Sequence, residues 1–332
     1  MTPLQQRCSM DESEITYRDW TAAMRAGDFE RAWAITDRDN ARLSRDDSHK
    51  HEGPRHQQRI WRGEPLRDRR ILVRCYHGLG DTIQFSRFLP ELARYADELS
   101  VWCQNPLIPF IEGLDGLKRV LPLHDGCPEV DYDVDIEIME VAQAIRAGRD
   151  LIEPIGPYLR LPETSQPNCG SLIWNGRCRT AIAVGLVWDV GDWDKRRSLP
   201  VSLLGRLAME GVQLYSLQLG SAAQVASTIG AVDISTPDII ALGRRIIDLD
   251  LIVCVDTMVA HLAGALWQEA WVLLHADCDW RWPSSGAASI WYPSIRLFHQ
   301  RRAGRWDEVI DEVREALAQR TAERNQRSRL SI

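Results

Sequence analysis

Hydrophobic and polar positions along the chain first predict a helical hairpin near the N-terminus. Between residues 13 and 46 the apolar side chains recur at near-helical spacing. Gly27 is suited to end one helix, and Asp28 is suited to cap the next. The pattern fits one tetratricopeptide-type repeat, and it fits an ordinary helical hairpin equally well. The apolar positions that carry it are Trp20, Met24, Phe29, Ala32 and Trp33.

Residues 36–70 are rich in charge and poor in apolar positions, which predicts a linker or a loosely held loop. From residue 71 onward, buried strand-like runs alternate with segments of helical periodicity, which is typical of a parallel sheet covered by helices. Strands are expected at 71–76, 99–103, 119–121 and 133–138, with helices at 82–95 and around 110–114.

A stretch rich in Pro, Asn, Gly and Ser at 161–179 predicts a connection between domains. The alternation then restarts, so two doubly wound α/β domains are expected in series, at 56–165 and 166–332, after a hairpin and linker at 1–55. Ligands of such sheets bind beyond the C-terminal ends of the strands, so a cleft is expected where the two domains face each other. The second set of strands is expected at 181–188, 212–217, 249–255 and 270–275, with helices at 201–209, 259–266 and 306–320.

Composition narrows the class of protein. The chain has 332 residues, of which 45% are apolar and 26% charged, as in globular proteins. Its net charge of −7 argues against nucleic-acid binding, although local basic clusters can still bind anions. None of the eight cysteines forms a C-x-x-C pair, which favours a reducing compartment. No signal peptide and no membrane-spanning run is evident, so we expect a cytoplasmic enzyme.

The first segment with candidate chemistry, residues 77–82, lies between a strand and a helix. Gly78 and Gly80 allow the backbone to approach a ligand without a clash at Cβ. Asp81 lies near the start of the helix, where it is either a functional carboxylate or only a helix cap. A third glycine of the dinucleotide fingerprint is missing.

The second segment, residues 255–261, again follows a buried strand and opens a helix. Free backbone N–H groups at a helix start favour a phosphate, and Thr257 and His261 are spaced to lie on one face of the helix. The segment therefore predicts a diphosphate site at Asp256, Thr257 and His261. The alternative is a capped helix with a buried, hydrogen-bonded histidine.

Two further segments carry charge or aromatic side chains. The run Lys195, Arg196 and Arg197 is suited to neutralise a phosphate, or it is a solvated loop. An aromatic stretch at 279–283, together with 291–293 and Gln300, either closes one side of the cleft or packs at the junction between the domains. Six of the thirteen tryptophans lie at or after residue 267, and each of them is either core or a stacking surface.

Taken together, these segments resemble glycosyltransferase family 9, in particular the heptosyltransferase-like domain of bacterial tetratricopeptide-repeat proteins. The resemblance implies a GT-B fold and an inverting transfer that needs neither a cofactor nor a metal. The donor would be a nucleotide-diphosphate sugar, and the acceptor a glycan, a peptide or a small metabolite. The matching stretches are 78–85, 184–188, 197–200, 215–218, 249–257, 260–266, 280–282 and 291–293.

The resemblance also implies roles for individual residues. Asp81 corresponds to the family's general base, which takes the proton of the acceptor hydroxyl. Donor binding is assigned to Asp256, Thr257, His261, Arg197, Lys195 and Gln218. The cleft and the acceptor side are assigned to His77, Gly78, Gly80, Gln84, Trp188, Trp280 and Arg281.

The chain departs from the family pattern in two places. The loop at 189–194 replaces the family's Gly-Asn type turn and adds negative charge beside the expected phosphate site. Only one helical hairpin is present, where relatives carry a long repeat array that could present a protein acceptor. A non-catalytic nucleotide- or partner-binding module on the same fold is therefore the alternative function.

Overall fold

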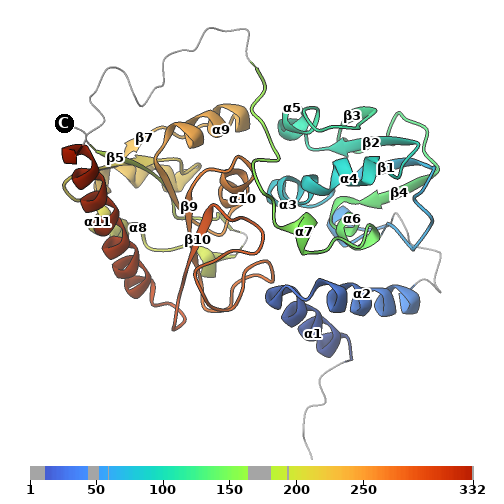
Figure 1. Ribbon diagram of the computed structural model, residues 1–332, viewed down its shortest axis with the longest axis horizontal. Helices are drawn as coiled ribbons and strands as arrows, with labels where there is room; N and C mark the ends of the chain where they lie inside the picture. Colours follow the sequence, from blue (N-terminus) through green and yellow to red (C-terminus); the bar gives the residue numbers. More distant parts are fainter. Residues whose placement is uncertain (1–11, 44–51, 59, 164–180, 193, 331–332) are drawn as a thin grey trace, which may run out of the picture.

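The computed structural model describes residues 12–43, 52–58, 60–163, 181–192 and 194–330. Two α/β units lie side by side, and a pair of N-terminal helices lies along one side of them (Figure 1). The described helices and strands, in chain order, are α1 (Glu12–Ala26), α2 (Phe29–Leu43), β1 (Arg70–Arg74), α3 (Leu79–Phe85), α4 (Leu89–Ala93), β2 (Glu98–Cys103), α5 (Ile108–Ile111), β3 (Arg119–Pro122), β4 (Val134–Glu137), α6 (Val141–Ala144), α7 (Arg149–Ile152), β5 (Ile182–Val187), α8 (Val201–Leu204), β6 (Val212–Ser216), β7 (Val232–Asp233), α9 (Ile239–Asp248), β8 (Leu251–Val255), α10 (Met258–Ala265), β9 (Ala270–Leu274), β10 (Ile295–His299) and α11 (Trp306–Leu330).

The first unit is built on a parallel sheet of four strands in the order β3-β2-β1-β4. In its centre, Val73 pairs with Val101 on one side and with Ile136 on the other, and all three side chains are buried. Because the strands are parallel, their C-terminal ends lie at one edge of the sheet, where a ligand site is expected.

The second unit is a parallel sheet of six strands in the order β10-β9-β8-β5-β6-β7. Alternate residues of β8, one of its two central strands, face two different hydrophobic cores. Ile252 and Cys254 belong to a core that continues through α10 into the first unit. Val253 and Val255 face a second core, which α11 covers. Both faces of the sheet are therefore buried, and the predicted doubly wound α/β class is confirmed.

The N-terminal hairpin forms as predicted, with a turn at Gly27 in the left-handed conformation (φ 69°). The Asp28 N–H donates to the Ala23 carbonyl at 2.9 Å, which closes the end of α1. Helix α2 continues to Leu43, so the predicted linker at 36–70 is wrong at its start, where the charged residues lie on a helix. Whether the hairpin descends from a tetratricopeptide repeat stays a prediction.

Several elements differ from the sequence prediction, among them the short α6, α7 and β7, which were not predicted. The helix expected at 82–95 is divided into α3, a short 3₁₀ turn and α4, with Pro90 in the first turn of α4, where its missing N–H is tolerated. Helix α9 was not predicted, although Asp238 caps it by accepting hydrogen bonds from the Ile240 and Ala241 N–H groups. Strand β10 was also not predicted. It lies at the sheet edge, and Arg296 interrupts its apolar run.

The predicted domain boundary at 165/166 lies outside the described residues, and so does most of the connection predicted at 161–179. Within the described part of the chain, no helix combines the length and the apolar character that crossing a membrane requires.

Candidate functional site

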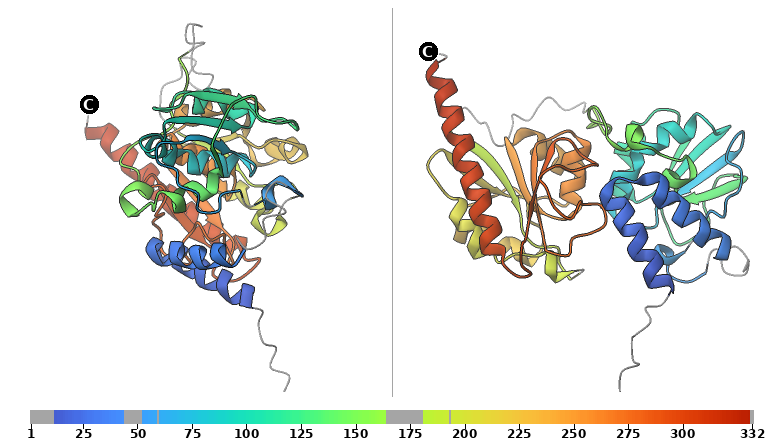
Figure 2. Two further views of the ribbon diagram at one scale, coloured as in Figure 1. Left: turned by 90° about the vertical axis from the view of Figure 1, so that its right-hand side faces the viewer. Right: turned by 60° about the horizontal axis from the view of Figure 1, so that its bottom comes forward.

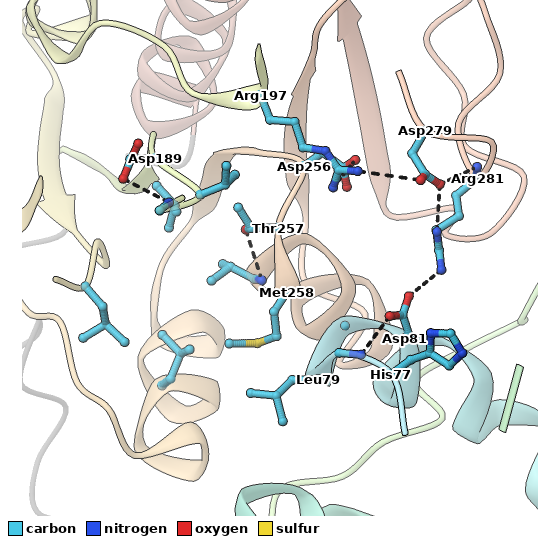
Figure 3. A pocket seen from close by; sticks show the side chains of 18 of the residues that line it. His77, Leu79, Asp81, Asp189, Arg197, Asp256, Thr257, Met258, Asp279 and Arg281 are labelled. Atoms are coloured by element: carbon cyan, nitrogen blue, oxygen red, sulfur yellow. Dashed lines mark hydrogen bonds and ion pairs between the residues drawn. The ribbon is translucent and has the colours of Figure 1, made fainter. Parts of the chain in front are cut away.

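A cavity of about 850 Å³ lies between the two units (Figure 3). Its walls come mainly from five segments that follow the C-terminal ends of β1, β5, β6, β8 and β9. This is the place where open parallel sheets bind their ligands. The five segments are 76–81, 187–191, 217–219, 256–259 and 279–281.

On the first unit, Asp81 lies in the first turn of α3. Its Oδ2 atom accepts a hydrogen bond from the Gly78 N–H at 3.0 Å, and Gly78 is the residue that caps the helix. Asp81 is therefore not the N-cap residue, but its carboxylate does cap the helix start from the third helical position, so the capping role holds and leaves a functional role untested. The side chain is 24% exposed, and it lines the cavity.

On the second unit, Asp256 and Thr257 lie between β8 and α10. The Thr257 hydroxyl accepts a hydrogen bond from the Val259 N–H at 3.3 Å, so it caps the helix. Asp256 is buried, with an Oδ2 atom 3.2 Å from Nη1 of Arg197. Burial raises the pKa of Asp256, and Arg197 opposes that shift.

A row of alternating charges joins the two units, and we call it the charge chain: Asp81, Arg281, Asp279, Arg197 and Asp256 (Figure 3). Arg281 contacts Asp81 across the cavity and donates to Asp279 at 2.8 Å. Arg197 lies 3.7 Å from Asp279. Burial alone would raise the pKa of Asp279, but the two arginines hold it below its usual value.

His261 lies on α10, next to the residues of the charge chain, and is almost entirely buried. Its Nδ1 atom is 2.9 Å from the Tyr292 hydroxyl, and its ring stacks near Trp282. Burial, reinforced by Arg281, lowers the pKa of His261 to about 3, so the imidazole is neutral at physiological pH. Figure 3 does not draw His261, which reaches only a side recess of about 120 Å³.

Gly80 lies at a close contact between the two units. A Cβ atom on Gly80 would lie 2.9 Å from the His261 ring and 3.5 Å from Cα of Met258. The absent side chain therefore lets α3 and α10 pack closely, which the prediction of close ligand approach did not anticipate. Gly78 lines the cavity, where only Asp81 lies near the position of a Cβ atom.

His77 forms the wall of the cavity next to Asp81, and Glu137 lies behind it. Nε2 of His77 is 3.7 Å from Oε2 of Glu137, and Glu137 accepts hydrogen bonds from the backbone N–H groups of Tyr76 and Met139. Burial raises the pKa of Glu137 well above its usual value. Burial lowers the pKa of His77, and Asp81 opposes that shift.

The predicted basic run divides into residues with different surroundings. Lys195, Arg196 and Arg197 form a 3₁₀ turn, and of these three only Arg197 lines the cavity. The Lys195 side chain is 61% exposed and lies 3.3 Å from Asp192. Arg196 is equally exposed and holds the pKa of Asp194 at about 2 through a side-chain hydrogen bond.

The remaining predicted residues support the wall in several ways. Gln218 lines the cavity, and its Oε1 atom accepts hydrogen bonds from the N–H groups of Trp188 and Asp189, both at 2.9 Å. The Trp188 ring is buried in the core under α11 instead of facing the cavity. Gln84 is buried and accepts a hydrogen bond from Nε of Arg281 at 2.7 Å. Trp280 lines the cavity.

The sequence patterns placed the segments 279–283 and 189–194 beside the site but assigned no role to Asp279 or Asp189, and they did not point to Glu137 at all. Asp279 had an available signal, since it directly precedes Trp280 and Arg281 after β9. Among the described residues that line the 850 Å³ cavity there are four aspartates and two arginines. The lining therefore carries more acidic than basic side chains. No cluster of three or more His, Cys, Asp or Glu side chains within the described residues could hold a metal ion.

Comparison with known proteins identifies the fold. No family model matches the chain. A glycosyl transferase of family 9 from Veillonella parvula DSM 2008 is 11% identical, with a TM-score of 0.53 over 71% of this chain and 87% of that one. The ADP-heptose LPS heptosyltransferase II of E. coli is 14% identical, with a TM-score of 0.51 over 76% of this chain and 99% of that one. The chain therefore has the two-unit fold of solved family 9 glycosyltransferases.

A curated relative has a similar sequence. Protein FlbA of Caulobacter vibrioides is 24% identical over 292 residues, a match that covers 77% of this chain. The chain spans 48% of the length of that relative.

Proposed function

We propose that this protein is a glycosyltransferase that moves a sugar from a nucleotide-diphosphate sugar to an acceptor hydroxyl. The observation that carries the proposal is the position of Asp81. Its partly exposed carboxylate lies in the first turn of α3, on the cavity wall, across from the start of α10 on the other unit. In such a transfer, a carboxylate on one side of the cavity can accept the proton of the acceptor hydroxyl. The N-terminus of a helix on the other side can bind the diphosphate of the donor.

In the proposed reaction, Asp81 takes the proton of the acceptor hydroxyl while that oxygen bonds to the anomeric carbon. The bond between the anomeric carbon and the phosphate oxygen breaks, and a nucleoside diphosphate leaves from the opposite side. The configuration at the anomeric carbon is therefore inverted. General-base assistance of this kind accelerates a reaction by roughly 10²–10⁴-fold.

The diphosphate would bind where α10 begins, near Thr257 and Arg197. Helix N-termini attract phosphates through their free N–H groups and the helix dipole. Arg197 pairs with Asp256 through Nη1, so a phosphate oxygen would bind the guanidinium beside that carboxylate or in its place. Burial raises the pKa of Asp256, which makes a neutral Asp256 easier to form when the phosphate arrives. We propose that the two arginines supply the positive charge for a leaving group that departs without a metal ion.

One observation favours the alternative, a non-catalytic binding module. Both arginines of the cavity wall already pair with aspartates of the protein, which reduces the positive charge available to stabilise a leaving diphosphate. A module of this kind would bind a nucleotide or a partner without transferring a sugar. The two functions differ in whether product forms once a donor is bound.

The proposal is tested with a panel of ADP-, UDP-, GDP- and CMP-sugars scored by thermal shift, followed by a transfer assay with the donor that binds. ADP-sugars come first, because the E. coli structure with this fold is named for ADP-heptose. A ligand at 100 times its dissociation constant stabilises the folded state by about 2.7 kcal/mol, which raises the melting temperature by several degrees. If no nucleotide sugar and no nucleoside diphosphate shifts the melting temperature, the donor site is wrong.

Two matched variants locate the donor. Arg197→Met removes the cation that lines the cavity, and we expect the donor-induced shift to fall sharply. Lys195→Met removes an exposed cation two residues away, and we expect the shift to stay near the wild-type value. Equal losses in both variants would indicate a diffuse electrostatic effect instead of a site at Arg197. A donor that binds tightly and is never transferred to any acceptor would favour the binding module.

A further inference from the structure

The N-terminal hairpin lies against both α/β units, as the right-hand view of Figure 2 shows. Helix α2 contacts the first unit, where Nε1 of Trp33 donates to the Ala147 carbonyl at 3.0 Å. Asp37, one turn further along α2, accepts a hydrogen bond from Gln143 at 2.9 Å. These contacts fix α2 beside α6 and α7.

Helix α1 contacts the second unit at the loop that follows β9. Trp20 meets Trp280 edge to face, with ring centroids 5.0 Å apart. Arg25 donates a hydrogen bond to the Cys278 carbonyl and lies 3.8 Å from Asp277. The hairpin therefore contacts Asp277, Cys278 and Trp280, which alternate with or adjoin Asp279 and Arg281 of the charge chain.

The turn of the hairpin lies where the two units meet. A Cβ atom on Gly27 would lie 2.6 Å from Nη2 of Arg149 in α7 and 3.3 Å from Cδ1 of Ile290 in the second unit. The hairpin is thus seated against both units at once. Its inward side chains Ala23, Met24 and Phe29 are at most 4% exposed and belong to the main core.

Trp280 connects the hairpin to the charge chain. The guanidinium of Arg281 lies 4.2 Å from the centre of the Trp280 ring, within the range of a cation–π contact. Trp280 also contacts Phe85 at 6.3 Å, and Phe85 lies on α3, the helix that carries Asp81. One aromatic ring therefore contacts the helix of Asp81 and the side chain of Arg281, and Trp20 covers it from the hairpin.

We infer that the hairpin positions the Asp81–Arg281 pair, with Trp20 acting through Trp280. Trp20 does not itself line the cavity and contacts its wall only through Trp280, so it is a positioning residue and not a catalytic one. Its edge-to-face contact restrains the Trp280 ring, and that ring restrains the guanidinium that contacts Asp81. The consequence for transfer rests on the proposed function, whereas the consequence for the order of the loop does not.

The test uses the full chain with Trp20→Ala and Trp20→Phe. An edge-to-face aromatic pair contributes about 1 kcal/mol, and one tenfold change in rate corresponds to about 1.4 kcal/mol. We expect Trp20→Ala to lower kcat about fivefold to tenfold, with the KM for the donor near the wild-type value. Trp20→Phe keeps an aromatic edge against Trp280, and we expect it to restore most of kcat.

Hydrogen–deuterium exchange of the free protein gives a readout that needs no substrate. Trp20→Ala is expected to speed exchange in peptides covering residues 277–283 and to leave those covering residues 98–103 unchanged. Trp33→Phe is the matched control, because it removes the hydrogen bond to Ala147 on the other unit without touching Trp280. We expect that variant to leave exchange at 277–283 and kcat unchanged.

Three outcomes overturn the inference: no change at 277–283 in Trp20→Ala, equal changes in Trp20→Ala and Trp33→Phe, or no rescue of kcat by Trp20→Phe. If the wild-type protein transfers no sugar at all, the proposed function fails separately. The exchange at 277–283 then still decides whether Trp20 orders the loop.

Discussion

The loop after β1 and the loop after β8 have the same local architecture and different surroundings. Each leads from a parallel strand into a helix, and each holds an aspartate that contacts an arginine of the second unit. The two arginines share Asp279, so the charge chain is nearly symmetric about that residue (Figure 3).

Burial distinguishes the two loops. The Asp81 side chain is 24% exposed, whereas that of Asp256 is 5% exposed. A carboxylate that reaches solvent in a cavity can exchange a proton with a ligand. A buried carboxylate instead holds its arginine in position. This difference in burial supports the proposed division, in which the junction on the first unit serves proton transfer and the one on the second unit binds the donor.

Replacing Arg281 should lower the free energy of unfolding more than replacing Arg197 or Gly80. Arg281→Met leaves Asp81, Asp279 and Gln84 without their shared donor. Breaking a buried ion pair on one side costs roughly 3–5 kcal/mol, and we expect the lower end because both carboxylates are partly exposed. Urea denaturation would measure the loss.

Arg197→Met and Arg281→Lys serve as controls in the same experiment. Arg197 is more exposed than Arg281, so we expect its loss to cost less. Arg281→Lys keeps one charge and should recover part of the stability. A cost for Arg281→Met equal to or smaller than that for Arg197→Met would show that burial does not distinguish the two ends of the charge chain.

Gly80 is the point where the two helices come closest, and Gly80→Ala should push them apart. The added methyl group would lie 2.9 Å from the buried His261 ring, and overpacking of this kind costs roughly 1–3 kcal/mol. Gly78→Ala meets only the Asp81 carboxylate, at 3.3 Å, so its cost should be smaller. The free energy of unfolding of the two variants decides the point. Equal values would mean that α3 and α10 are not in tight contact.

His261 should make the protein less stable in acid. Above pH 6.5, its ordinary pKa, neither the folded nor the unfolded imidazole binds a proton. As the pH falls from 6.5 toward 3, the unfolded chain takes up a proton that the folded protein does not. The free energy of unfolding therefore falls, by up to about 1.4 kcal/mol per pH unit from this group.

His261→Gln should flatten the loss of thermal stability between pH 6.5 and 4.5, as measured by melting temperature. Tyr292→Phe removes the hydrogen-bond partner and leaves the buried ring, so the acid sensitivity should persist in that variant. If His261→Gln and the wild-type protein lose stability in parallel, then the imidazole is not kept neutral by burial.

Local patterns predicted the junctions, but they could not show how the two units meet. The buried run of β8 and the capping Thr257 are evident in the sequence, and so is the glycine-bounded loop before Asp81. The pairing of Asp81 with Arg281 joins residues 200 positions apart, and spacing along the chain carries no information about it. Gly80 shows the same limit, since its role depends on His261 of the other unit.

The basic run illustrates a second limit. Lys195 and Arg197 are two residues apart, and from the sequence both fit a phosphate site. The 3₁₀ turn directs Arg197 into the cavity, whereas the exposed Lys195 lies between Asp192 and Asp189 and does not line the cavity. Glu137 was missed for a related reason. A charged residue at the end of a predicted strand is usually exposed, but here the loop around Tyr76 and Met139 covers it.

The most direct test of the division between the two loops compares wild type with Asp81→Asn in two assays on the same preparation. With saturating donor, kcat should fall roughly 10²–10⁴-fold, because the amide cannot take up the acceptor proton. The donor-induced rise in melting temperature should stay at the wild-type value, because the proposed donor site lies on the other unit. Wild-type turnover in Asp81→Asn, or loss of donor binding together with turnover, would contradict the account.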